Sequence, residues 1–471
     1  MKYLLFYILL LINVTQIYAQ VFDVETIKTS GDNDKRINLV ILSEGYQSTE
    51  FTKFETDATN FVNDMFSQLP FSEYSNYFNV HIIKVPSNES GADHPGTASD
   101  VSEPASPIGF VDTYFNATFD AFGYHRLLYY EIDENAVNNT QAKIYSVLAD
   151  NFPNYDQALI LVNSNEYGGS GGEFPMASTG LSANEIAIHE LGHSLFDLKD
   201  EYIVPDAYYS EAINMTQETN ATSVKWKNWM GINSIGIFPY GTTGTSATWN
   251  RPHQNCKMRY LGVPFCSVCK EGIIEKIHDL ISPVDSYSPV ATTVDNPTFP
   301  IDFHLTLIKP IPNNLESVWT LNASNFANDV DDISIIETDL VEGSNNLTAI
   351  ITDSTNNLKV DNHETIHLYT VTWTINYSSL GIEDINSITN NLSITMFPNP
   401  TTDIVNFKFE NNNNLDLKVE LVSIDGKKIT SLIITNYETQ ELDISNLSQG
   451  IYLTNFYTNN VLIASKRLVK N

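Results

Sequence analysis

Two kinds of apolar segment alternate between residues 36 and 280, and this alternation constrains the fold more than any other feature. Largely apolar runs, typical of strands, occupy residues 38–42, 78–83 and 158–162. After the first run, apolar side chains recur at helical spacing, at Phe51, Phe54, Ala58, Phe61, Val62 and Met65. Strands that alternate with helices in this way predict an α/β layer structure.

Beyond residue 282 the pattern changes to short β-rich runs separated by Asn, Asp, Gly and Pro. Runs such as residues 303–307 predict a β-sandwich over residues 283–376. A polar stretch over residues 377–394 is expected to be a linker. Residues 395–471 are again β-rich, with a turn predicted at Asp425-Gly426.

The charge is strongly negative and unevenly distributed. The chain has 25 Lys and Arg against 57 Asp and Glu, a net charge of -32, which argues against nucleic acid or anionic membranes as partners. From residue 395 onward, however, seven basic residues nearly balance eight acidic ones. This near-neutral tail is therefore expected to be a separate module.

The N-terminus has the features of a signal peptide over residues 1–19. Lys2 precedes an apolar run at residues 3–12, and the small Ala19 stands where cleavage would occur. The alternative is a membrane anchor, but the run is short for a span. We expect a chain that is exported through the periplasm, is secreted or held at the cell surface, and keeps no stable membrane span.

A pair of histidines on a predicted helix suggests a metal site. Ser182 and Glu185 have the spacing of a capping box, which would start the helix. His189 and His193 then lie one turn apart on one face and can bind one zinc ion, while Glu190 can take a proton from a zinc-bound water. The alternative is two solvated histidines, which the cap, the preceding strand and the export signal disfavour.

A catalytic zinc normally takes three protein ligands, so a third is needed. In a continuous helix Asp200 would lie about 16 Å along the axis from His189 and could not reach the same ion. The helix must therefore end after His193 and the chain must fold back. Asp197 is expected to adopt the left-handed turn, which leaves Asp200 as the ligand. The alternative is that Asp200 and Glu201 are surface charges.

Several motifs that occur in order resemble those of the bacterial IgA peptidase family, a metzincin-like group of zinc metallopeptidases. The resemblance covers about residues 36–280. The segments that carry it are 43–46, 70–71, 77–80, 90–95, 167–172, 189–193, 198–202, 256–259 and 265–269.

The resemblance implies a role for each matching residue. His189, His193 and Asp200 would hold one catalytic zinc, Glu190 would be the general base, and Met258 would lie in the turn beneath the zinc. One departure is Asp197, where the family usually has Gly. The turn must therefore be made with a side chain present.

Other residues near these motifs are candidates for contact with the substrate or the transition state. Gly168 and Gly169 could form an edge strand that binds the substrate backbone, or a flexible loop. Tyr202 could support Asp200 or the oxyanion. Tyr260, two residues past Met258, occupies the place where some metzincins have a tyrosine that stabilises the transition state.

The three cysteines, Cys256, Cys266 and Cys269, admit two interpretations. In an exported protein we favour one disulfide with one thiol left free. With His253, the spacing also permits a second, structural zinc site.

The tail resembles the C-terminal sorting domain of the type 9 secretion system of Bacteroidetes. The segments that carry this resemblance are residues 397–401, 425–427 and 447–452, with Lys466-Arg467 near the end. The implied partner is the type 9 secretion machinery. The alternative is a small carbohydrate-binding or adhesive β-module.

Together these features predict a secreted zinc endopeptidase that acts on a protein or peptide substrate. A different zinc amide hydrolase or a non-catalytic surface adhesin are the alternatives. The family name does not identify immunoglobulin as the substrate.

Overall fold

The computed structural model describes residues 21–130, 140–295, 297–361, 363–378, 392–410, 416–434, 439–458 and 461–471. The predicted signal peptide and most of the predicted linker lie outside these residues. The chain divides into two compact units. The first comprises residues 1–339 and 345–375, and the second comprises residues 340–344 and 376–471. The domain boundary predicted at residue 282 stays a prediction.

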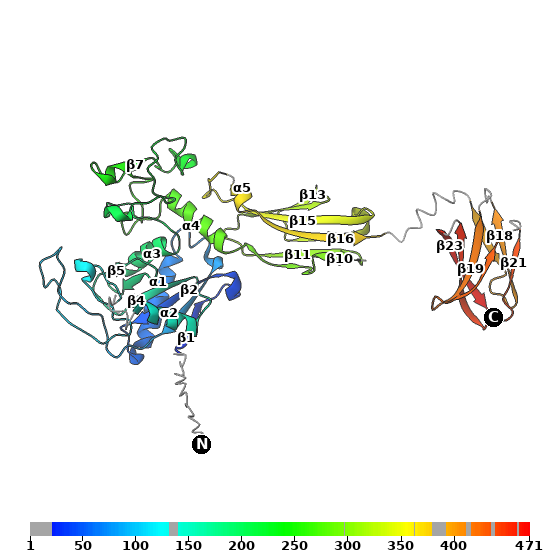
Figure 1. The fold of residues 1–471 in the computed structure, drawn as a ribbon, viewed down its shortest axis with the longest axis horizontal. Coiled ribbons are helices and arrows are strands. Elements are labelled where there is room, and N and C mark those ends of the chain that lie inside the picture. Colours follow the sequence, from blue (N-terminus) through cyan, green and yellow to red (C-terminus); the bar gives the residue numbers. More distant parts are fainter. Residues whose placement is uncertain are drawn as a thin grey trace, which may run out of the picture. The chain divides into compact units, whose positions relative to one another are not determined.

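A six-stranded sheet forms the centre of the N-terminal region (Figure 1). Its strands follow the order β1-β3-β2-β4-β6-β5, with β2, β3, β4 and β6 parallel and the two edge strands antiparallel to their neighbours. The bounds are β1 Asp23–Lys28, β2 Ile37–Glu44, β3 Phe78–Lys84, β4 Gln157–Val162, β5 Gly169–Ser170 and β6 Met176–Ser178. The three strands predicted from apolar runs are thus β2, β3 and β4.

Helices cover both faces of this sheet. They are α1 Phe51–Met65, α2 Thr140–Asn151, α3 Ala183–Ser194 and α4 Ser267–Leu280. Leu39 and Ile41 of β2 point into a core shared with α1, α3 and α4, whereas Val40 and Leu42 point into a second core with α2. The predicted α/β layer structure is therefore confirmed. None of the helices in the described part of the chain combines the length and apolarity needed to cross a membrane.

The region after α4 is almost entirely β-structure. A five-stranded sheet has the order β10-β16-β15-β12-β13, and a three-stranded sheet has the order β14-β11-β9. The bounds are β9 Val284–Ser288, β10 Thr293–Asp295, β11 Ile301–Leu307, β12 Leu315–Leu321, β13 Ser324–Asn328, β14 Asp332–Ile335, β15 Gly343–Asp353 and β16 Tyr369–Tyr377, with the short helix α5 His363–Ile366 before β16. Phe303 of β11 contacts Trp373 of β16, with ring centroids 5.1 Å apart, so the two sheets meet through aromatic side chains.

Buried polar contacts join this β-region to α4 and to the loop before β3. The Asp353 carboxylate, at the end of β15, accepts a hydrogen bond of 2.6 Å from Tyr74 and lies 2.9 Å from Nε2 of His278 in α4. All three residues are buried. The β-region thereby supports the C-terminal half of a helix whose N-terminal end lies near the site described below.

The second unit contains a three-stranded sheet, β17-β18-β21, and a four-stranded sheet, β20-β19-β22-β23, around an apolar core. The bounds are β17 Ser393–Phe397, β18 Ile404–Glu410, β19 Leu417–Ser423, β20 Lys428–Ile433, β21 Gln440–Asp443, β22 Gly450–Thr458 and β23 Val461–Lys470. The predicted turn at Asp425-Gly426 joins β19 to β20, and Gly426 has the positive φ of 81° that favours glycine. The predicted β-rich tail is confirmed.

Candidate metal centre

Helix α3 carries His189, Glu190 and His193 and begins directly after Ser182, as predicted, but without the predicted capping box. Ser182 has a left-handed backbone with φ of 66°, and its side chain makes no capping hydrogen bond. The Glu185 carboxylate instead binds the amino group of Lys257 and accepts a hydrogen bond of 2.8 Å from the backbone N–H of Gly262. The predicted capping box is therefore wrong, because the carboxylate is drawn to a buried lysine. Glu185 ties the start of α3 to the segment that follows Met258.

The helix ends where the position of Asp200 requires it to end. Its last residue is Ser194, one residue after His193. The backbone N–H of Asp197 donates to the carbonyl of His193 at 3.2 Å, and that of Leu198 to the carbonyl of Gly192 at 2.9 Å. Asp197 has φ of 56°, so a residue with a side chain makes the left-handed turn. Its carboxylate lies at the surface, 2.9 Å from the Lys276 amino group.

Two backbone carbonyls determine which nitrogen each histidine presents to the site. His189 Nδ1 lies 3.0 Å from the carbonyl oxygen of Lys257, and His193 Nδ1 lies 2.7 Å from that of Leu198. A carbonyl oxygen can only accept, so both Nδ1 atoms must carry the proton. In its neutral form each ring then presents the lone pair of Nε2, the arrangement that orients metal-binding histidines.

Asp200 completes a set of three acceptor atoms. Its Oδ1 lies 3.1 Å from His189 Nε2 and 3.2 Å from His193 Nε2, and the two Nε2 atoms are 3.2 Å apart. Ligands held tetrahedrally about 2.0–2.1 Å from a zinc ion lie about 3.3–3.4 Å from one another. The three side chains therefore fit a small divalent cation with three protein ligands and room for a further one.

The electrostatics of this site favour a bound positive charge. Burial lowers the pKa of His193, but the neighbouring Asp200 and Glu190 carboxylates outweigh it and raise that pKa to about 9. Burial would raise the pKa of Asp200, but the two histidines hold it well below its usual range. Both shifts have one cause: the Asp200 and Glu190 carboxylates make the space between the histidines favourable for positive charge.

Glu190 lies beside this set of ligands. Its carboxylate oxygen lies within 4.8 Å of ligand atoms of both histidines. Burial raises the pKa of its carboxyl group, and the two histidines partly offset this effect. A Cβ at Gly171 would come within 2.7 Å of Glu190 Oε2, so glycine at this position leaves room for the carboxylate. In the sequence, Gly171 stands out only as part of segment 167–172, which carries the family resemblance.

Met258 packs directly beneath α3. The side chain is completely buried, and a Cβ at Gly192 would come within 2.8 Å of its sulfur atom. The carbonyl of Met258 accepts a hydrogen bond of 2.7 Å from the N–H of Glu201, the residue after Asp200. Met258 therefore contacts the helix that carries the histidines and also supports the segment that carries Asp200.

The site opens into a cleft of about 1510 Å³ that is lined by Tyr202 and Tyr260, among other residues. The Tyr202 ring stacks on His189, with ring centroids 6.4 Å apart. Burial, and to a smaller extent the nearby Asp200 carboxylate, raises the pKa of the Tyr202 hydroxyl. The Tyr260 side chain is about half exposed, with the Arg259 guanidinium over its ring. Both tyrosines are thus placed where a ligand in the cleft can reach them.

Gly168 and Gly169 do not offer the free strand edge that the sequence suggested. The Gly169 N–H donates to the carbonyl of Arg126, and its carbonyl accepts from the N–H of Leu128, both at 3.4 Å. The Gly168 carbonyl accepts from the N–H of Ser178 at 3.1 Å. Gly169 does belong to the edge strand β5, but residues 126–128 occupy the side of it where a substrate backbone could have added.

Two residues that sequence analysis missed hold the segment around Asp200. The Tyr240 hydroxyl donates to the Asp200 carbonyl at 2.7 Å. The buried Asn214 side chain bonds both the N–H and the carbonyl of Lys199, at 2.9 and 2.7 Å. Both residues lie in irregular segments and belong to no sequence motif, so neither periodicity nor spacing could have identified them.

The favoured disulfide is not formed. Cys256, Cys266 and Cys269 are free, buried thiols, and the Sγ atoms of Cys256 and Cys269 are 3.6 Å apart. His253 does not join them, because its Nδ1 contacts the backbone of Asn255 in an exposed loop. The buried carboxylate of Glu201 takes the fourth place in the cluster.

Comparison with known proteins supports the two resemblances. Residues 25–240 match the family model of the IgA peptidase M64 family, and residues 395–471 match that of a secretion system C-terminal sorting domain. The first match includes α3 and Asp200 but ends before Met258 and the cysteines. The first match is to a peptidase family, over less than half of the chain. The second indicates handling by the type 9 secretion system and confirms the predicted localisation at the cell surface or in the medium.

Matches to whole proteins add little. No curated protein sequence matches the chain. Similar solved structures include dimeric latent PorU from Porphyromonas gingivalis, at 13% identity over 40% of this chain and 20% of that one, with a TM-score of 0.15. Another is the mixed-linkage glucan utilization locus protein SGBP-B of Bacteroides ovatus, at 11% identity over 38% of this chain and 41% of that one, with a TM-score of 0.14. The chain thus spans less than half of either protein, and such scores carry no argument about the fold.

The left-handed turn at Asp197 generates a prediction about stability. Asp197→Val should lower the free energy of unfolding by about 1–2 kcal/mol, because a β-branched residue is strained at positive φ. Asp197→Gly should be neutral or slightly stabilising, since the lost ion pair with Lys276 is exposed. Denaturant unfolding measures both. Equal destabilisation by the two variants would contradict a role for backbone strain.

The Tyr240 hydroxyl generates a prediction about metal affinity. Tyr240→Phe should weaken zinc binding about 10-fold, because the carbonyl of the ligand-bearing residue loses its donor. The matched control is Tyr209→Phe, since the Tyr209 hydroxyl contacts only the N–H of Val204, at 3.4 Å, among the contacts described. Competition with a chromophoric chelator gives the affinities. A Tyr240→Phe affinity equal to that of the control would contradict the supporting role.

Proposed function

We propose that the chain is a secreted zinc-dependent endopeptidase that hydrolyses peptide bonds of extracellular proteins. The observation that carries the proposal is the convergence of three acceptor atoms, His189 Nε2, His193 Nε2 and Asp200 Oδ1, at mutual distances of 3.1–3.2 Å. Such a set offers three ligand atoms to one cation, and the combination of two imidazoles with one carboxylate is typical of catalytic zinc.

The proposed ligands are His189, His193 and Asp200, which would hold one catalytic zinc. When bound, this ion supplies a Lewis acid that polarises the scissile carbonyl and lowers the pKa of a water molecule. The match to the IgA peptidase M64 family supports the peptidase assignment. In the same proposal, residues 20–282 form a metzincin-like catalytic domain. Residues 283–376 form a β-sandwich domain.

Glu190 is proposed as the general base. Its carboxylate lies next to the histidine ligands, in a space that Gly171 keeps open. Burial raises the pKa of this carboxyl group toward the working range of a proton shuttle. Glu190 would therefore take a proton from the attacking water and pass it to the leaving amine.

Other residues have supporting roles in this proposal. Met258 would support helix α3 from below, through its buried contact with Gly192. Asp197 would form the left-handed turn that brings the chain back to the site. Tyr202 and Tyr260 line the cleft and can donate hydrogen bonds to the oxyanion of the transition state. The open cleft favours an extended protein segment over a small, enclosed substrate.

Replacement of Glu190 tests the proposal. Glu190→Gln should lower kcat/KM for peptide cleavage by about 10²–10⁴-fold while zinc remains bound, because a proton acceptor is lost and the ligands are untouched. A peptide library assayed with and without a chelator supplies the measurement. Glu316→Gln, the same change on the exposed face of β12, is the matched control and should leave activity unchanged.

The outcomes separate the alternatives. Undiminished cleavage by Glu190→Gln would contradict the general base. If zinc binds but the wild-type protein cleaves no peptide in the library, a different amide hydrolase or a non-catalytic adhesin becomes the better account. An amidase would then release ammonia from amide substrates in a chelator-sensitive manner.

A further inference from the structure

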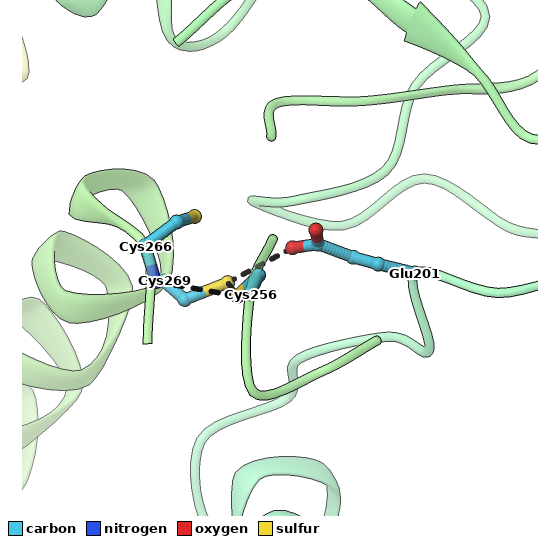
Figure 2. A group of neighbouring side chains, drawn as sticks. All are labelled: Glu201, Cys256, Cys266 and Cys269. Atoms are coloured by element: carbon cyan, nitrogen blue, oxygen red, sulfur yellow. Dashed lines mark hydrogen bonds between the residues drawn. The ribbon is translucent and has the colours of Figure 1, made fainter. Parts of the chain in front are cut away.

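A second group of possible metal ligands lies behind the first. Figure 2 shows Glu201, Cys256, Cys266 and Cys269 directed toward one another from three segments of the chain. All four side chains are buried, and one ligand atom of each lies within 4.8 Å of the others. Glu201 directly follows Asp200, Cys256 precedes Met258 by two residues, and the other two cysteines begin α4.

The spacing of the sulfur atoms argues against a disulfide and suits a shared ion. Cys256 Sγ and Cys269 Sγ are 3.6 Å apart, whereas bonded sulfurs lie about 2.05 Å apart. In a tetrahedral site with Zn–S bonds of about 2.3 Å, two sulfurs lie about 3.8 Å apart. Cys269 Sγ and Glu201 Oε1 are 3.2 Å apart, near the roughly 3.5 Å between a sulfur and an oxygen in such a site.

Glu201 provides a second, independent observation. Its carboxylate is completely buried, and Oε2 has no hydrogen-bond partner among the described residues. The other oxygen, Oε1, contacts Cys269 Sγ and the Asn214 amide, both at 3.2 Å. A buried carboxylate with an unpartnered oxygen is costly unless a cation or a proton is close. This oxygen belongs to the carboxylate that adjoins the three thiols.

The surrounding chain has the features of a thiolate site. The backbone N–H of Cys266 donates to Cys256 Sγ at 3.2 Å, which favours a negatively charged sulfur. Zinc with three thiolates and one carboxylate has a net charge of −2. Arg251, a buried cation whose charge interacts with that of Glu201, partly offsets this charge.

We propose that Glu201, Cys256, Cys266 and Cys269 bind a second zinc ion with a structural role. Four protein ligands leave no open position, so this ion takes no part in hydrolysis. It would join the segment that carries Asp200, the Met258 turn beneath α3, and the start of α4. The Glu201 N–H already donates to the Met258 carbonyl at 2.7 Å, so the ion would reinforce an existing link. The proposal does not depend on the catalytic function proposed for the first site.

Metal content separates the two sites. The wild-type chain, expressed with zinc and freed of loosely bound metal, should hold two equivalents. The variant His189→Ala/His193→Ala should retain one equivalent, and so should Cys266→Ser/Cys269→Ser if it folds. With cobalt in place of zinc, the histidine variant should show near-ultraviolet thiolate-to-cobalt charge transfer, which a site of histidines and a carboxylate cannot produce.

A thiol titration supplies a readout that needs no cysteine variant. After denaturation with chelator and without reductant, the wild-type protein should show three reactive thiols. One reactive thiol would mean that two of the three cysteines have formed a disulfide, and this result overturns the proposal. One equivalent of zinc in the wild-type protein, together with none in the histidine variant, also overturns it. Loss of peptide cleavage in Glu190→Gln bears only on the first site.

Discussion

The return of Asp200 to the two histidines of α3 is the constraint on which the rest of the structure depends. The helix ends at Ser194, and a left-handed residue at position 197 reverses the chain within three residues of Asp200. Without that reversal, Asp200 would lie about 16 Å along the axis from His189. With it, one carboxylate oxygen lies 3.1 and 3.2 Å from the two Nε2 atoms.

The surrounding contacts hold both helix α3 and the returning segment around Asp200 in place. The carbonyls of Lys257 and Leu198 orient the histidine rings, and Tyr240 and Asn214 hold the backbone around Asp200. The Met258 segment contacts both sides, because its side chain packs under Gly192 and its carbonyl binds Glu201. A structural zinc at Glu201 and the cysteines would strengthen this same support from behind. The site is therefore a small set of ligands held by a much larger network of backbone contacts.

The sequence predicted correctly those features that depend on residues close together in the chain. Apolar periodicity identified β2, β3, β4 and α1, and a reach argument over eleven residues located the helix end and the turn at Asp197. It failed where long-range partners decide the outcome. Ser182 and Glu185 have capping-box spacing, but the buried Lys257, 72 residues away, captures the glutamate. The cysteine spacing suggested His253, whereas folding brings Glu201 to the sulfurs. The free edge expected at Gly169 is covered by residues 126–128, which no pattern had linked to it.

The most direct test of the central claim is a crystal structure of the protein loaded with zinc, with anomalous data collected on both sides of the zinc absorption edge. The account predicts an anomalous peak about 2.0–2.2 Å from His189 Nε2, His193 Nε2 and an Asp200 carboxylate oxygen, with a fourth position open to the cleft. A peak that the two histidines share with another side chain, with Asp200 turned away, would contradict it. So would the absence of any peak between the two histidines.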